Sequence, residues 1–127
     1  MEGTYKIIND IEQIQLLRKL IGWNPLTKQQ WEIMLKNSSW MYSVWEKDSL
    51  LGMGRAVSDG RYCMIYDVIV HKDYQGKGIG TKIIKSLIKK AKKGIRIGIF
   101  IENKEFLIKF YESQGFQPIN GMQLIKE

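Results

Sequence analysis

The sequence YDVIVHKDYQGKGIG, residues 66–80, places an apolar run directly before a glycine-rich segment. The apolar run is typical of a strand, and the lysine-rich residues after Gly80 have the spacing of a helix. A glycine-rich loop that opens into a helix turns main-chain N–H groups toward one point, with the positive end of the helix dipole behind them. These residues therefore predict an anion-binding loop, and the expected anion is a pyrophosphate.

The spacing of the glycines separates this loop from two other phosphate loops. It lacks the Gly-Lys-Ser/Thr triplet of a Walker A loop. Gly76, Gly78 and Gly80 are two apart, whereas the dinucleotide fingerprint has its third glycine three residues after the second. The pattern Q/R-x-x-G-x-G/A fits instead, as Gln75-Gly76-Lys77-Gly78-Ile79-Gly80.

Length and composition are those of one globular domain, residues 1–127, with 44% hydrophobic and 26% charged residues. No apolar run reaches about 18 residues, and the N-terminus has no signal-peptide pattern. We therefore expect a cytoplasmic protein with no membrane partner. The single cysteine, Cys63, excludes an intrachain disulfide and argues against a cysteine-based metal site, so it is expected to be a buried structural thiol and no metal is expected.

The net charge of +7 is partly local, because seven lysines and no acid lie between Gln75 and Lys93. A basic patch can bind nucleic acid, can bind a small polyanion, or can be a solvated helix face. No aromatic residues are interleaved with these lysines as a stacking platform for bases requires, so nucleic acid is the less favoured partner. Lys77 differs from the other lysines because it sits inside the loop.

Periodicity and capping residues predict an α/β order of elements. A helix at 10–20 begins at Asp10, and a second begins at Thr27, where Gln30 completes a capping box. The other expected elements are a β-prone opening at 4–8, strands at 40–45, 50–57 and 62–70, a helix from 79 that ends at Gly94, a central strand at 95–101, a helix at 104–114, and a closing β-hairpin from 116–118 and 122–125.

Residues 110–116 read FYESQGF, which is similar to an F-Y-x-x-x-G-F signature. With the loop pattern and the order of elements, this signature makes the chain resemble the GNAT superfamily, the acetyl-CoA-dependent N-acetyltransferases. The diagnostic similarity lies in residues 66–116, and the order of elements matches along essentially the whole chain. The resemblance implies a GNAT fold, in which a mixed central β-sheet with splayed strands is flanked by helices and the pyrophosphate loop precedes a central helix.

The resemblance also implies the reaction. Acetyl-CoA would be the co-substrate, and a small-molecule or peptide amine would accept its acetyl group by direct transfer in a ternary complex, since no cysteine or serine nucleophile is placed for a covalent intermediate. Many relatives form homodimers through their closing strands. Two alternatives stay open, a coenzyme-binding module without catalysis and a basic nucleic-acid-binding domain.

Coenzyme-binding residues follow from the same resemblance. The main chain before the loop would pair with the pantetheine arm, and the loop N–H groups would surround the pyrophosphate, with added charge from Lys77 and Lys82. Asn103 lies eight residues before Tyr111, whereas the family often has an asparagine seven before its tyrosine, so a pantetheine contact and a helix N-cap are both open. The predicted coenzyme-binding residues are Val68, Ile69, Val70, Gln75, Gly76, Lys77, Gly78, Ile79, Gly80, Thr81, Asn103 and Phe110.

Two residues are the candidates for catalysis. The resemblance points the Tyr111 hydroxyl at the coenzyme sulfur, where it would protonate or stabilise the departing thiolate; the alternative is a tyrosine that only packs. Asp67 interrupts an apolar strand and is either a general base or ammonium ligand, or a structural hydrogen-bond hub. Glu102 is a second candidate base, His71 is expected to be exposed or structural, and Trp23 is placed on the acceptor side by the resemblance.

Overall fold

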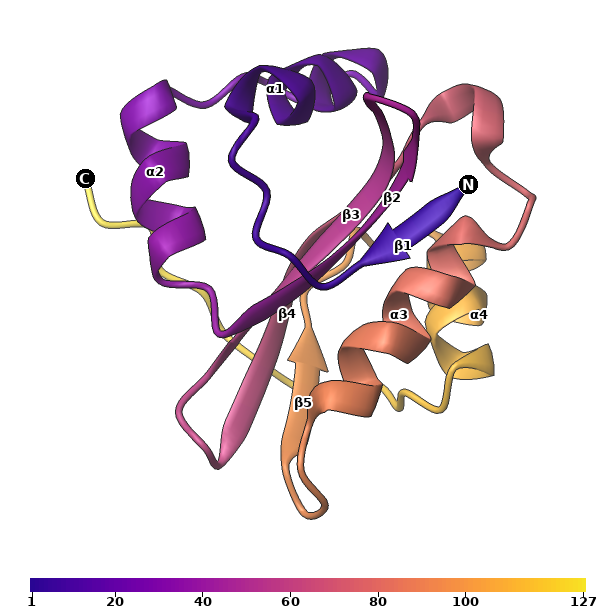
Figure 1. The fold of residues 1–127 in the computed structure, drawn as a ribbon. Helices are drawn as coiled ribbons and strands as arrows, with labels where there is room; N and C mark the ends of the chain where they lie inside the picture. Colours follow the sequence, from indigo (N-terminus) through magenta and orange to yellow (C-terminus); the bar gives the residue numbers. More distant parts are fainter.

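The structure is a computed structural model that describes all 127 residues (Figure 1). Its elements in chain order are β1 Glu2–Thr4, α1 Ile11–Leu20, α2 Lys28–Lys36, β2 Trp40–Glu46, β3 Ser49–Ser58, β4 Tyr62–Val70, the 3-10 helix η1 Lys72–Tyr74, α3 Ile79–Lys90, β5 Arg96–Ile99 and α4 Glu105–Ser113. The two predicted caps are confirmed: Asp10 accepts from Gln13, and Thr27 with Gln30 makes the capping box.

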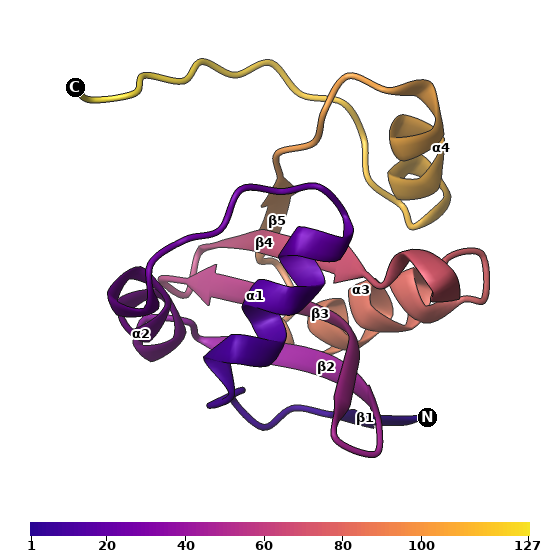
Figure 2. The same cartoon turned by 90° about the horizontal axis from the view of Figure 1, so that it is seen from above.

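One mixed sheet organises the chain, with strand order β1-β2-β3-β4-β5. The first three pairings are antiparallel and the β4–β5 pairing is parallel. Helices α1 and α2 cover one face, and α3 and α4 cover the other (Figures 1 and 2). The predicted α/β fold of GNAT type is confirmed. None of the helices is both long and apolar enough to span a membrane.

Each face of the sheet has its own apolar core, because successive side chains of a strand point to opposite faces. On β2, Met41 packs with the α1 and α2 residues Ile14, Leu17 and Trp31. Its neighbour Tyr42 packs instead with the cluster that contains α3 and Tyr111 of α4. The sheet therefore separates the α3–α4 side from the α1–α2 side.

Glycines in β3 let α3 lie close to the sheet. A Cβ atom at Gly54 would lie 2.8 Å from Leu87 Cδ1 and 2.9 Å from Ile83 Cγ2, both on α3. A Cβ atom at Gly52 would lie 2.9 Å from Ile83 Cδ1. Because real Cβ atoms do not approach so closely, only glycine at these two positions allows α3, the helix behind the glycine-rich loop, to pack this close to β3.

The middle of β4 carries a β-bulge at Asp67, which has a left-handed φ of 54°. Arg55 pairs with Tyr66 and Met53 pairs with Ile69, so two β4 residues face one β3 residue between these pairs. On its other edge β4 pairs with β5 only from Tyr62 to Ile65. Beyond Ile65, β4 has a strand partner on one side only, and the two parallel strands splay.

Four predicted boundaries are wrong. The strand at β5 covers only Arg96–Ile99 and is an edge strand instead of a central one, because no closing hairpin forms beside it. The segment after Phe116 is irregular (Figure 2); its apolar side chains, Met122 and Leu124 among them, find no apolar surface, and Pro118 cannot donate to a ladder. The first strand covers Glu2–Thr4 instead of the predicted 4–8, and α3 ends at Lys90, before Gly94.

Candidate active site

The glycine-rich loop has the conformation of an anion-binding turn. Gly76 and Gly78 have φ values of 78° and 85°, in the left-handed region that glycine tolerates. Gly78 is the N-cap of α3 and offers no side-chain cap, so the first N–H groups of the helix have no intrahelical partner. A Cβ atom at Gly76 or Gly78 would meet no protein atom within 4 Å. The two glycines are therefore needed for backbone conformation, and the space in front of the loop is open.

Side chains next to the loop fix its approach from β4. Gln75 Nε2 donates to the Val70 carbonyl at 3.1 Å. His71 Nδ1 accepts from the Asp73 N–H at 3.1 Å, which caps η1 and gives the histidine a structural role, one of the two expected for it. The Lys77 ammonium lies 5.3 Å from the centre of the Tyr74 ring.

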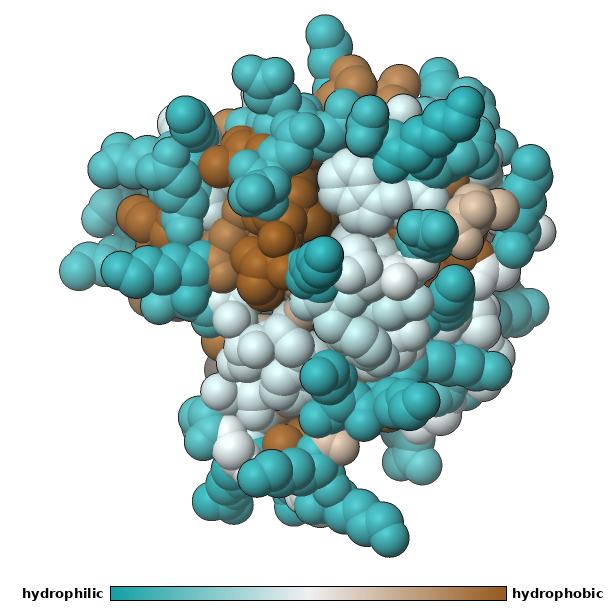
Figure 3. Space-filling model, in the orientation of Figure 1, coloured by the Kyte–Doolittle hydropathy of each residue, from teal (hydrophilic) through white to brown (hydrophobic).

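Most of the other lysines form the solvated face of α3. Lys82, Lys85, Lys89 and Lys90 are exposed, and hydrophilic side chains stand over α3 in the space-filling view (Figure 3). Apolar surface on this face of the molecule gathers beside α2 instead. Lys82 lies in the first turn of α3, near the loop, whereas Lys89 and Lys90 lie in the last turn. The helix itself carries no aromatic residue, and the one aromatic ring beside its lysines is that of Tyr5, 4.8 Å from Lys90 Nζ.

The predicted pantetheine edge lies on the splayed part of β4. Val68 and Val70 pack against the core that contains α3, and Ile69 is buried in the core that contains α1. The structure thus places this edge directly before the loop and on the part of β4 that lacks a β5 partner. Contact of Val68, Ile69 and Val70 with a coenzyme stays a prediction.

Helix α4 brings Tyr111 beside the first turn of α3. Gln114 Nε2 donates to Thr81 Oγ1 at 3.5 Å, and a Cβ atom on Gly80 would lie 3.4 Å from Phe110 Cζ. Tyr111 is 7% exposed, with Phe110 and Phe116 edge-on at centroid distances of 5.0 and 5.6 Å. Phe110 and Gln114 of α4 thus contact Gly80 and Thr81 in the first turn of α3. The catalytic and coenzyme-binding roles of these residues stay predictions.

The Tyr111 hydroxyl makes no hydrogen bond within the protein. A buried tyrosine with a purely structural role usually has a hydrogen-bond partner for its hydroxyl. Burial raises the pKa of Tyr111 to about 12. The phenol is therefore a weaker acid than an ordinary tyrosine. Its predicted catalytic role stays a prediction.

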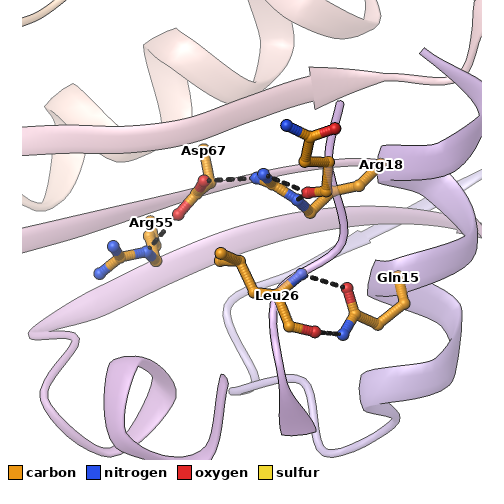
Figure 4. A network of polar contacts seen from close by, with 6 residues as sticks. Gln15, Arg18, Leu26, Arg55 and Asp67 are labelled. Carbon is orange, nitrogen blue, oxygen red and sulfur yellow. Dashed lines mark hydrogen bonds and ion pairs between the residues drawn. The ribbon is translucent and has the colours of Figure 1, made fainter. Parts of the chain in front are cut away.

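The Asp67 carboxylate is held by two guanidinium groups (Figure 4). Arg55 Nε donates to Oδ2 at 2.7 Å, and Arg18 Nη1 donates to Oδ1 at 3.3 Å. All three side chains are mostly buried, with 11% to 13% of each exposed. With an arginine on each carboxylate oxygen, this geometry favours the hydrogen-bond hub over the general base, and the catalytic role predicted for Asp67 stays a prediction.

The remaining candidates lie on the surface or in the core. Asn103 is exposed, and Lys104 is the N-cap of α4, so the N-cap hypothesis for Asn103 is wrong. Glu102 is 62% exposed and pairs with Lys104 at 3.2 Å. Cys63 is 1% exposed, which confirms a buried thiol, and burial raises its pKa. Trp23 lies in the loop after α1 and is 37% exposed.

The two arginines that hold Asp67 were not among the predicted site residues. Arg55 is the single charged residue between Leu50 and Val57, in a strand that is otherwise apolar or small. A lone cation and a lone anion in neighbouring strands are a signal for a buried pair. Arg18 gives no comparable signal, because it lies on a helix with other polar residues.

Comparison with known proteins agrees with this fold. Residues 20–126 match the family model of the acetyltransferase (GNAT) domain. The chain is 31% identical over 119 residues to an uncharacterized N-acetyltransferase, ycf52, of Pyropia yezoensis, and the match covers 90% of this chain and 68% of the relative. A probable acetyltransferase of unknown function from meticillin-resistant Staphylococcus aureus has a similar structure, with a TM-score of 0.86, 30% identity and coverage of 99% and 98%.

A GNAT-family acetyltransferase from Streptococcus pneumoniae is similar too, with a TM-score of 0.85, 27% identity and coverage of 98% and 97%. Fold and matches together define an acyltransferase of the N-acetyltransferase type. The chain belongs to the GNAT family. It spans between 62% and 68% of the length of the four ycf52-type relatives that it matches.

Proposed function

We propose that residues 1–127 form a single domain that transfers the acetyl group of acetyl-CoA to a primary amine, directly and within a ternary complex. The observation that carries the proposal is the uncapped N-terminus of α3 behind two left-handed glycines, with the unbonded Tyr111 hydroxyl on the adjacent helix. The unpaired N–H groups suit a pyrophosphate, and the splayed edge from Val68 to Val70 offers main chain to the pantetheine arm.

The proposed reaction needs no covalent intermediate on the protein. The amine nitrogen attacks the thioester carbonyl, a C–N bond forms, and the C–S bond breaks to release a thiolate. The amine loses one proton and the sulfur gains one, so the exchange balances. Asp67, Glu102 and water are the candidates for the base that takes the proton of the amine. Because arginines hold both Asp67 oxygens, we favour water as this base.

The raised pKa of Tyr111 favours one of two roles for its hydroxyl. A phenol with a pKa of about 12 is a much weaker acid than a thiol, whose ordinary pKa is about 8.5. Full proton transfer to the thiolate would therefore be unfavourable. We propose that Tyr111 donates a hydrogen bond to the developing thiolate and that water supplies the proton afterwards.

The charge around Asp67 bears on the acceptor. Two guanidinium groups and one carboxylate leave this mostly buried cluster with a net positive charge. We propose a small-molecule or peptide acceptor with one amine and few additional cations, since a polycation would meet repulsion here. The cytoplasmic location and the homodimer expected from the sequence and the resemblance stay predictions.

Calorimetry with acetyl-CoA tests the proposal on wild type, Gly78→Glu and Gly60→Glu. Gly60 is the matched control, because it too has a positive φ and open space around its Cβ position, in the turn between β3 and β4. We expect wild type and Gly60→Glu to bind and Gly78→Glu to lose binding. Equal binding by all three variants would move the site away from the loop.

An amine panel with thiol detection tests the transfer itself. The panel contains n-butylamine, phenethylamine, spermidine and a lysine peptide, and we expect thiol release that depends on an amine and is slowest with spermidine. Binding without turnover would favour the inactive coenzyme-binding module. No acetyl-CoA binding by folded wild type, with salt-dependent binding to RNA or DNA, would favour the nucleic-acid alternative.

A further inference from the structure

Arg18, near the end of α1, contacts two segments that are far apart in the sequence (Figure 4). Its Nε and Nη2 atoms donate to the Asn24 carbonyl at 3.1 and 2.9 Å. Its Nη1 atom donates to Asp67 on β4 at 3.3 Å. The guanidinium also lies 5.0 Å from the centre of the Trp23 ring and 5.8 Å from that of Trp31. One side chain therefore ties the loop of residues 22–26 to the bulge of β4.

The loop of residues 22–26 has few other restraints. The Trp23 N–H donates to the carbonyl of Arg18 at 3.0 Å, which holds its first residues. The amide of Gln15 both donates to and accepts from the main chain of Leu26, which holds its end. Between these points, the Asn24 carbonyl accepts from the Arg18 side chain, and the ring of Trp23 makes a cation–π contact with the same guanidinium. The Gly22 N–H also donates to the Lys19 carbonyl at 3.1 Å, and Leu26 packs against the core that contains α1. The Arg18 side chain is thus the restraint on the middle of the loop, between these two held ends.

The other end of the contact lies at a strained point of β4. Asp67 has a left-handed φ of 54°, which residues other than glycine seldom adopt. Such a conformation persists where its surroundings hold it, and here Arg18 and Arg55 hold both carboxylate oxygens. Val68, the next residue, begins the edge proposed for pantetheine. The bulge is therefore a fixed reference point beside that edge.

We propose that Arg18 is a positioning residue for the amine acceptor. By binding Asn24 and Asp67 together, it holds the loop of residues 22–26, with Trp23, at a set position over β4 before substrate arrives. In this arrangement Asp67 anchors Arg18 and is not the base. The proposal rests on the proposed function for its kinetic consequences only, because the order of the loop is a property of the free protein.

Arg18→Gln tests the proposal, with Lys19→Gln as the matched control. Lys19 is the exposed neighbour on the same helix, and its contact with the loop is the main-chain bond from the Gly22 N–H to the Lys19 carbonyl, 3.1 Å long. The control therefore loses the same charge and keeps this bond. Hydrogen exchange of the free protein is the first measurement. We expect Arg18→Gln to raise exchange at residues 22–26 by roughly tenfold or more while the amides of α3 keep their protection, and Lys19→Gln to match wild type. Unchanged exchange at residues 22–26 in a folded Arg18→Gln protein would overturn the proposal.

Kinetics give the second measurement, with the panel amine that wild type acetylates fastest. We expect Arg18→Gln to raise the KM for the amine roughly tenfold to a hundredfold, with acetyl-CoA affinity within about twofold of wild type. Equal losses for both substrates would indicate a general structural role and would also overturn the proposal. If wild type acetylates no amine, the proposed function fails, and the exchange experiment still decides whether Arg18 orders the loop.

Discussion

Arg55 Nε and Asp67 Oδ2 lie 2.7 Å apart on the neighbouring strands β3 and β4, and Arg55 is one of only two buried polar residues of the protein. Arg55 pairs across the strands with Tyr66, and its guanidinium lies 4.9 Å from the centre of that ring. The β-bulge thus sets two consecutive β4 residues, Tyr66 and Asp67, against one arginine. Removing the Asp67 charge would leave two mostly buried guanidinium groups without a counter-charge, and an uncompensated buried charge is strongly destabilising.

Asp67→Asn is therefore expected to destabilise the fold. The substitution keeps the size of the side chain but leaves two guanidinium groups without a counter-charge, and we expect the free energy of unfolding to fall by roughly 3 kcal/mol. Urea denaturation measures this loss. Asp73→Asn is the control, because the Asp73 side chain is 71% exposed and should change stability little. Equal stability of Asp67→Asn and wild type would contradict a hub role and revive the general base.

Gly54→Ala tests the close packing of α3 against β3. The added methyl group would lie 2.8 Å from Leu87 Cδ1, so helix or strand must shift, and such overpacking costs about 1–3 kcal/mol. Thermal and urea unfolding measure the change. Gly121→Ala is the control, because nothing lies within 4 Å of the Cβ position there. A Gly54→Ala protein as stable as its control would show that α3 does not depend on this close approach.

Much of the fold could be predicted from the sequence because its signals are local. The caps at Asp10 and Thr27 and the lysine-free face of α3 each lie within a few residues, and all appear in the structure. The prediction of a closing hairpin was wrong because an apolar stretch such as residues 122–125 forms a strand only where a neighbouring strand pairs with it. The same missing partner made β5 an edge strand.

The candidate site likewise contains a part that local sequence predicts and a part that depends on long-range contacts. The loop depends on glycines at fixed spacing, so an anion-binding loop could be predicted from residues 75–80 alone. The left-handed φ values of Gly76 and Gly78 were found in the structure. The environment of Asp67 depends on Arg18, 49 residues away in the sequence, and on Arg55. No local pattern joins these residues, since the β-bulge that brings them together is a property of strand register. The two ion pairs that favour the hub role of Asp67 could therefore be found only in the structure.

Tyr111→Phe tests the proposed hydrogen bond to the thiolate. The substitution removes one oxygen and leaves the ring contacts with Phe110 and Phe116 in place. Loss of a single preorganised donor typically lowers kcat by about a hundredfold or more, and we expect that loss here with little change in acetyl-CoA affinity. Steady-state kinetics and calorimetry separate the two effects. Tyr62→Phe, at an exposed tyrosine, is the control. A Tyr111→Phe enzyme with wild-type kcat would leave Tyr111 as a packing residue.

Alkaline pH gives an independent test of the burial of Tyr111. Burial raises the pKa of its hydroxyl from 10.0 to about 12, so above pH 10 the unfolded chain loses this proton before the folded protein does. The unfolding free energy is therefore unaffected below pH 10, falls between about pH 10 and 12, and levels off above that range. Two pH units correspond to about 3 kcal/mol for one group.

The difference in unfolding free energy between wild type and Tyr111→Phe isolates this one hydroxyl from the other tyrosines. We expect that difference to be constant up to pH 10 and then to move in favour of Tyr111→Phe, which has no proton to lose at this position. Urea titrations at pH 8, 10 and 11 would show the change. Parallel curves for the two proteins would mean that the hydroxyl is already solvated in the folded state. Tyr111 would then lack the dry environment in which a hydrogen bond to a thiolate is strong.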